Sequence, residues 1–149
     1  MLQAFVDDSA SHSGDRRLLL AGYILPAEVW LAFSADWRVA LDASPPLKSL
    51  HMTKSFHGWS AEQRRIKLDL LMSVIQKYRP VSIECSISKR DFDEVLAGET
   101  PHDLRHPYFY CFHALVVQAA RLVNELGLHG PLEFVFDTQG NVGTNAALW

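Results

Sequence analysis

The sequence lacks the features that mark membrane, secreted and zinc-binding proteins. It has only two cysteines, Cys85 and Cys111, which lie inside strand-like and helix-like runs and have no metal-site spacing. They are expected to be buried free thiols, which fits a reducing compartment. No apolar stretch reaches the roughly 18 residues that a membrane helix needs, and the N-terminus leads into a strand instead of a signal peptide. We therefore expect a cytoplasmic protein without a membrane partner.

An excess of positive charge is also lacking. The 149 residues carry a formal charge of -3, and basic residues gather only in short groups at Arg16-Arg17, Arg64-Arg65 with Lys67, and Lys89-Arg90. Nucleic acid is a candidate partner only through a local patch, because the overall charge neither establishes nor excludes it. The group at 64 to 67 begins a predicted helix, where a solvated face is the commoner role and phosphate contact the rarer one.

No repeat, low-complexity tract or linker divides the chain, so residues 1–149 are predicted to form a single domain. Apolar periodicity predicts strands over residues 2–7, 18–25, 81–88 and 132–137, with a short edge strand over 47–52. Helices are predicted over residues 26–42, 60–78, 91–97 and 108–126. This order implies an α/β domain with a mixed sheet, an N-terminal antiparallel hairpin and flanking helices.

Helix ends and one helix face have recognisable signals. Ser60 followed by Gln63 has the pattern of a capping box, and Gly127 suits the C-terminal end of the long helix. Trp30, Phe33 and Trp37 recur at helical spacing, which predicts a core face and not a platform for stacking bases.

Two neighbouring carboxylates, Asp7 and Asp8, end the first predicted strand, and Asp137 ends the last one. Since successive side chains of a strand point to opposite faces, Asp7 and Asp8 cannot both face the core. A carboxylate near buried backbone needs a partner, and a hard cation is one way to satisfy it. Two strands that each deliver an aspartate to an edge can hold such a cation. The alternative is that both residues are strand-end caps of the following loops.

Several stretches occur in order along the chain: Phe5–Ser9, Ala21–Ile24 leading to Pro26 and Trp30, Leu50–Met52 and Phe134–Asp137. Together they resemble the bacterial and phage family called domain of unknown function 3800. The resemblance implies a fold similar to ribonuclease H and a nuclease or phosphodiesterase that depends on Mg²⁺ or Mn²⁺. Family members continue beyond this point with another aspartate in a C-terminal helix. The chain is therefore expected to be truncated, with its last helix missing and its activity weak or absent.

The resemblance also implies roles for individual residues. Asp7 matches the first-strand carboxylate of the family, Asp8 its glutamate position, Asp137 the late-strand acid and His51 the histidine of a Leu-His pair. The implied metal ligands are Asp7, Asp137 and Asp8, with Asp8 expected to be solvated or outside the ligand shell. The implied catalytic residues are Asp7, Asp137 and His51. Ala10 and Ala21 depart from the family pattern, which has glycine at those positions.

Other readings of these residues remain open. His51 can instead be a partly buried histidine satisfied by backbone groups, and Glu84 is expected to lie exposed on the polar side of its strand, with a ligand role as the rarer alternative. His102, His106 and His113 have no zinc spacing with either cysteine. The alternative function is a non-enzymatic interaction or regulatory module of a bacterial defence or mobile-element system. A partner or a second copy (a homo-oligomer) is expected to cover the unfinished C-terminal face.

Overall fold

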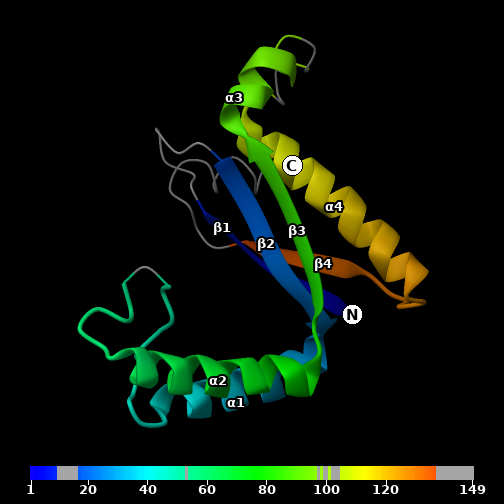
Figure 1. Cartoon of the computed structure of the whole chain (residues 1–149). Coiled ribbons are helices and arrows are strands. Elements are labelled where there is room, and N and C mark those ends of the chain that lie inside the picture. The colour runs from blue at the N-terminus through cyan, green and yellow to red at the C-terminus, as the bar shows by residue number, and fades with distance from the viewer. Residues whose placement is uncertain (10–16, 53, 97, 99–100, 102–104, 137–149) are drawn as a thin grey trace. The chain divides into compact units, whose positions relative to one another are not determined.

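The computed structural model of the chain describes residues 1–9, 17–52, 54–96, 98, 101 and 105–136 (Figure 1). The chain forms two compact units. The sheet unit comprises Met1–Leu25 and Val81–Trp149, and the helical unit comprises Pro26–Pro80. None of the described helices combines the length and apolar character that a bilayer-spanning helix requires.

The sheet unit is built on four strands, which confirms the α/β class and the mixed sheet. These are β1 (Leu2–Ser9), β2 (Arg17–Pro26), β3 (Val81–Ser88) and β4 (Leu132–Phe136). Their order in the sheet is β3-β2-β1-β4. β2 and β3 pair antiparallel, β1 and β4 pair parallel, and β1 and β2 run in opposite directions (Figure 1). Consecutive strands that run in the same direction, as β3 and β4 do, need a crossover connection. The chain between them supplies it as a long helix.

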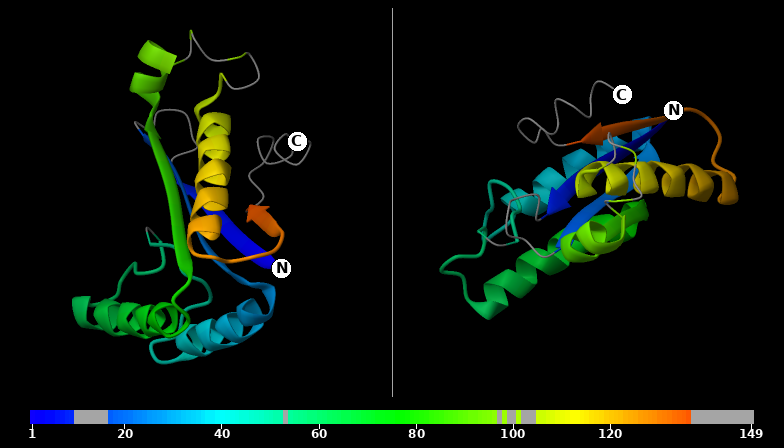
Figure 2. Two further views of the ribbon diagram at one scale, coloured as in Figure 1. Left: turned by 90° about the vertical axis from the view of Figure 1, so that its right-hand side faces the viewer. Right: turned by 90° about the horizontal axis from the view of Figure 1, so that it is seen from above.

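That crossover helix, α4 (Pro107–Glu125), lies along one face of the sheet (Figure 2). It buries Tyr108, Cys111, Leu115, Ala119 and Val123, which recur every three or four residues and so form one helical stripe. The sheet meets this stripe with alternate residues of its strands, such as Leu2, Ala4 and Val6 of β1. Each large apolar side chain buried in this way contributes about 1.5–3 kcal/mol. The α4 face of the sheet is therefore the core of the unit.

The C-terminal end of α4 and the helical segment after β3 agree with the sequence predictions. Gly127 has a φ of +64°, the left-handed conformation that glycine adopts without strain after a helix. The short helix predicted over 91–97 is observed as α3 (Lys89–Asp91) continuing into the π-helical turn η1 (Phe92–Leu96).

Gly22 is the point where β2 passes closest to β1. A Cβ atom added to Gly22 would lie 2.3 Å from the carbonyl oxygen of Phe5 and 2.9 Å from Cγ2 of Val6. Real Cβ atoms do not approach backbone oxygen so closely, so any larger residue must displace one of the two central strands.

We therefore expect Gly22→Ala to lower the free energy of unfolding by about 1–3 kcal/mol, the usual cost of overpacking a tight interior. Gly98→Ala is the matched control, because no atom lies within 4 Å of a Cβ at that position. Urea denaturation followed by circular dichroism measures both variants. Equal midpoints for the two would show that β1 and β2 do not need this contact.

The helical unit contains α1 (Ala27–Asp42) and α2 (Ala61–Tyr78). The predicted capping box at the start of α2 is confirmed, since Ser60 Oγ accepts from Gln63 N and Gln63 Oε1 accepts from Ser60 N. The predicted aromatic core face is confirmed for Phe33, whereas Trp30 and Trp37 are half-buried. Phe33 is buried and its ring lies 5.1 Å from that of Trp30 and 5.7 Å from that of Trp37.

The edge strand predicted over residues 47–52 is wrong, because the structure has bends and turns there. Ser55 explains the difference. Its hydroxyl accepts a hydrogen bond from His51 N at 2.6 Å and donates one to Ser49 O at 3.0 Å. Side-chain bonds of this kind give the backbone a local alternative to strand pairing.

Lys67 also differs from expectation, because it is fully buried instead of belonging to a solvated basic face. Its Nζ donates to the carbonyl oxygens of Ala40, Leu41 and Ala43 at 2.6, 2.9 and 2.8 Å. These carbonyls belong to the C-terminal end of α1, where helical acceptors have no partner within the helix. Burial lowers the pKa of Lys67, and the negative charge of Asp42 opposes that shift. Three acceptors match the three donors of an ammonium group, so the side chain fastens α2 to the end of α1.

Replacing Lys67 with methionine keeps the side-chain length but removes all three hydrogen bonds. We expect Lys67→Met to lower the free energy of unfolding by about 2–4 kcal/mol, because the carbonyls lose a charged donor. Lys77→Met is the control: Lys77 pairs with Asp36 at the surface, where such pairs contribute about 1 kcal/mol or less. Thermal unfolding of both variants tests this, and similar losses would contradict a special role for the buried ammonium.

Candidate functional site

The face of the sheet opposite α4 carries a hollow with a volume of about 700 Å³. All four strands line it, and the polar side chains among the lining residues are Asp7, Tyr23, Ser82 and Glu84. Phe5 and Val135, paired across β1 and β4, supply much of the apolar lining. A hollow of this volume with a few converging polar groups is of the kind that binds small ligands.

Asp7 lies near the carboxyl end of β1 and is exposed on this face. Its Oδ1 accepts a hydrogen bond from the backbone N–H of Asp8 at 2.8 Å, which holds the carboxylate close to the strand. The remaining oxygen positions of a carboxylate can still accept donors or a cation. Asp7 is thus held in place and remains open to solvent.

Glu84 reaches the same hollow from β3. It pairs with Ala21 of β2, which directly precedes Gly22, and Gly22 lies against Phe5 and Val6 of β1. Asp7 and Glu84 therefore stand on strands that flank β2, about 9–10 Å apart at the backbone by the usual spacing of two strands. The small side chain of Ala21 leaves the space between them open. Glu84 is exposed as predicted, and its place in this hollow follows from the strand order.

The prediction that Asp8 is the solvated member of the pair is wrong. Asp8 is half-buried with its Oδ2 fully enclosed, while Asp7 is the exposed residue. The alternation along β1 explains this, because Asp8 follows Leu2, Ala4 and Val6 on the face that α4 covers.

Two side chains at the start of α4, those of Tyr108 and His106, have shifted pKa values. Burial raises the pKa of the Tyr108 phenol, and the negative charge of Asp8 raises it further. His106 is the N-cap residue of α4, and its Nδ1 accepts from Tyr108 N at 3.2 Å. Burial lowers the pKa of His106, and the positive charge of Lys89 acts in the same direction. The imidazole must stay neutral to accept this bond, so the start of α4 is sensitive to acid.

The lowered pKa of His106 gives a pH dependence with a definite sign. Between the folded-state pKa and the ordinary value of about 6.5, the unfolded chain holds the proton and the folded chain does not, so stability falls as the pH falls through this window. His106→Asn keeps a side-chain acceptor suited to a helix N-cap but cannot titrate. We expect the urea midpoint of the original chain to fall more than that of the variant between pH 7 and pH 5. Parallel profiles would contradict this role of His106.

The two cysteines are free thiols that meet beside the core, and the predicted burial is confirmed for Cys111 alone. Cys111 of α4 is fully buried, and Cys85 of β3 is partly exposed. Burial and a hydrogen bond with Cys85 raise the pKa of Cys111 to about 12. Cys111 is therefore a neutral thiol at physiological pH and serves packing, not nucleophilic chemistry.

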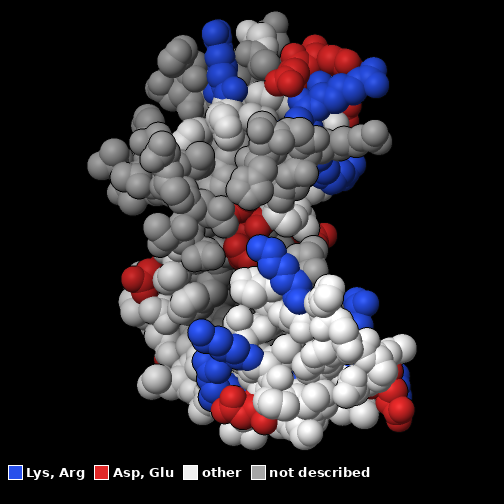
Figure 3. All heavy atoms as spheres, turned by 90° about the vertical axis from the view of Figure 1, so that its left-hand side faces the viewer, with Lys and Arg blue, Asp and Glu red and all other residues white. Residues whose placement is uncertain are grey.

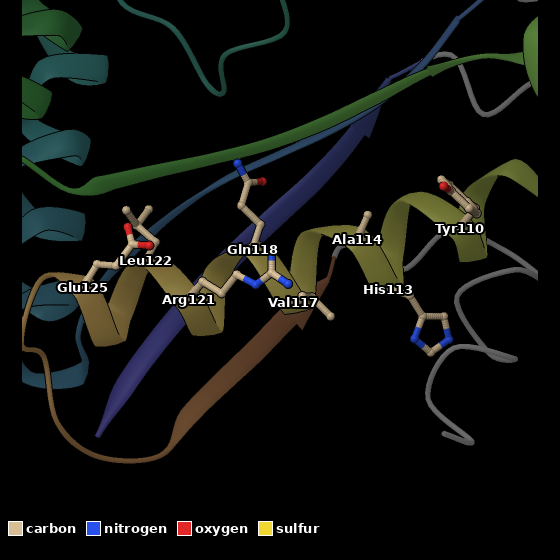
Figure 4. Close-up of a pocket in the computed structure, with 8 residues that line it drawn as sticks. All are labelled: Tyr110, His113, Ala114, Val117, Gln118, Arg121, Leu122 and Glu125. Atoms are coloured by element: carbon tan, nitrogen blue, oxygen red, sulfur yellow. The ribbon is translucent and has the colours of Figure 1, made fainter.

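A second hollow, of about 610 Å³, runs along the outward face of α4 (Figure 4). Tyr110, His113, Val117 and Arg121 line it along the helix, and Glu125 is the one acid among its lining residues. A single carboxylate and one imidazole do not make a hard-cation site. The hollow beside Asp7 is therefore the better candidate for metal-dependent chemistry.

The remaining residues implied by the family resemblance are placed differently. His51 lies in the helical unit with an exposed side chain, so its share in a site with Asp7 remains a prediction. Asp137 lies outside the described residues. Among the residues that are described, no group of three or more His, Cys, Asp or Glu side chains could hold a metal ion. Asp7 and Glu84 supply oxygen donors, which suit Mg²⁺ or Mn²⁺, but they do not complete a ligand set.

Comparisons with protein-family models, curated proteins and solved structures found no match to this chain. The resemblance to the domain of unknown function 3800 therefore remains a prediction from the motifs.

Proposed function

We propose that the sheet unit is a ribonuclease-H-like scaffold for divalent-metal-dependent cleavage of phosphodiesters, of the kind implied by the resemblance to the domain of unknown function 3800. The observation that carries the proposal is the position of Asp7. This carboxylate is exposed at the carboxyl end of a central strand and faces a hollow large enough for a ligand. Ligands of α/β sheets commonly bind beyond the carboxyl ends of strands.

The parallel pairing of β1 and β4 supports a second ligand. The register places Val6 beside Phe136, and the next residues in the sequence are Asp7 and Asp137. Neighbouring strands lie about 4.8 Å apart, a spacing from which two carboxylates can hold one ion. Asp137 enters the proposal on its sequence position, and Glu84 is a further carboxylate on the same face.

The residues then have separate tasks. Asp7 and Asp137 would hold Mg²⁺ or Mn²⁺, and an ion of this kind would supply activation of water and neutralisation of charge on the phosphate. Asp8 is left outside the ligand set because it faces α4. The family resemblance implies a further role for His51 as a proton carrier.

The first test is Mn²⁺ binding by the chain, measured by titration calorimetry. We expect Asp7→Asn to weaken binding at least tenfold, because it removes a charged ligand while keeping the shape of the side chain. Asp8→Asn is the matched control with the same change of charge one residue away on the other face. It should leave Mn²⁺ affinity within about twofold, provided that circular dichroism shows it folded.

The same variants separate the two function classes. If Asp7→Asn binds Mn²⁺ as the original chain does, the metal-site proposal fails and the non-enzymatic interaction module becomes the better description. If Mn²⁺ binding is lost and Mg²⁺- or Mn²⁺-dependent cleavage of single-stranded DNA or RNA is lost with it, the nuclease proposal stands.

A further inference from the structure

The helical unit has a hollow of its own, about 540 Å³, at the start of α2. Two aromatic and two basic side chains line it: Phe56, Trp59, Arg64 and Arg65. The rings of Phe56 and Trp59 meet edge to face with centroids 5.5 Å apart. The guanidinium of Arg64 lies over the Phe56 ring, 5.3 Å from its centroid. We call these four residues the aromatic–basic pocket.

The charge of the helical unit suits an anionic ligand. Residues 26–80 contain eight lysines and arginines against five aspartates and glutamates, a formal charge of +3 in a chain whose total is -3. Figure 3 shows blue lysine and arginine side chains, with a few red acidic ones, on a largely uncharged surface of this unit. The unit therefore supplies the local basic surface that the overall composition hides.

The arginines of the pocket remain available to a ligand. Asp69 is the one acid among the lining residues, and it pairs with Arg65 at 3.7 Å. Both side chains are about 70% exposed, so this ion pair is weak. Arg64 is exposed and contacts an aromatic ring, and it forms no ion pair with any acid in the part of the chain that the structure describes. The helix dipole of α2 adds partial positive charge at the same end. Phosphate oxygens can therefore meet two guanidinium groups here.

The pocket is also held in shape before any ligand arrives. Ser55 fixes the preceding turn through its bonds to His51 N and Ser49 O, and the capping box of Ser60 and Gln63 fixes the start of α2. Phe56 and Trp59 are half-buried between these two fixed points. Preorganisation of this kind lowers the entropy lost on binding.

We propose that the aromatic–basic pocket binds single-stranded nucleic acid, with a base stacked on Trp59 and the adjoining phosphates at Arg64 and Arg65. Aromatic rings beside guanidinium groups match the alternation of base and phosphate in a single strand. A duplex keeps its bases stacked inside and presents only its phosphates. The proposal deepens the proposed function, since it names the strand that the sheet unit would cleave, and it rests on that function for this link.

The test is fluorescence anisotropy of a labelled ten-nucleotide oligothymidylate with the full chain, in EDTA so that no cleavage or metal binding takes part. We expect Trp59→Leu to weaken binding roughly tenfold and Trp59→Phe to retain most of the affinity, since phenylalanine also stacks. Arg64→Gln and Arg65→Gln should each lower the slope of log affinity against log salt by about 0.7, the value for one phosphate contact on a single strand.

Lys48→Gln is the matched control, because it removes one exposed positive charge of the same unit from outside the pocket. It should change affinity less than Arg64→Gln does. Circular dichroism and thermal unfolding check that each variant is folded. If Trp59→Leu does not fold, the salt dependence of Arg64→Gln compared with Lys48→Gln carries the test.

The outcomes separate this inference from the proposed function. Equal binding by Trp59→Leu, displacement by a polyglutamate peptide as effective as by unlabelled strand, or equal losses in Lys48→Gln and Arg64→Gln would each overturn the pocket proposal. Strand binding that depends on Trp59 in a chain whose Mn²⁺ binding does not depend on Asp7 would sustain the pocket and remove the metal-site proposal. Cleavage with unchanged binding in all pocket variants would do the reverse.

Discussion

The close contact between β2 and β1 at Gly22 is the constraint on which the sheet unit depends. Without a side chain, Gly22 allows its strand to lie against the carbonyl of Phe5 and the side chain of Val6. Each of these two strands also pairs with an outer strand. Ala21 of β2 pairs with Glu84 of β3, and Phe5 of β1 pairs with Val135 of β4. The contact therefore sets which side chains share the hollow on the open face.

The alternation of β1 then gives the two faces of the sheet different chemistry. Asp7 is exposed beside the hollow, where water or a cation can satisfy its charge at little cost. Asp8 lies on the α4 face, and its charge adds to burial in raising the pKa of Tyr108. A charge near the core restricts what can pack around it, so Asp8 affects the start of α4 and not the hollow.

Much of this fold could be predicted from the sequence, because the signals are local. Ser60 with Gln63 marks the start of α2, Gly127 follows the end of α4, and alternation marks β3. The failures depend on contacts between distant residues. Lys67 is buried because of carbonyls 24 to 27 residues away, and the loop at 47–52 is held by Ser55. Of the candidate site, Asp7 could be predicted, whereas Glu84 joins it only through the strand order.

The two units of the chain have net charges of opposite sign, which the total charge does not show. The sheet unit has twelve acids against six lysines and arginines, a formal charge of -6, whereas the helical unit has +3. Carboxylates suit a hard cation, and guanidinium groups beside aromatic rings suit phosphate and base. A single basic or acidic surface serves only one of these ligands, since the charge that attracts one repels the other. The two proposed ligands, a metal ion and a nucleic acid strand, therefore require opposite charges, which the chain keeps in separate compact units, each folded around its own contact: Gly22 in one and Lys67 in the other.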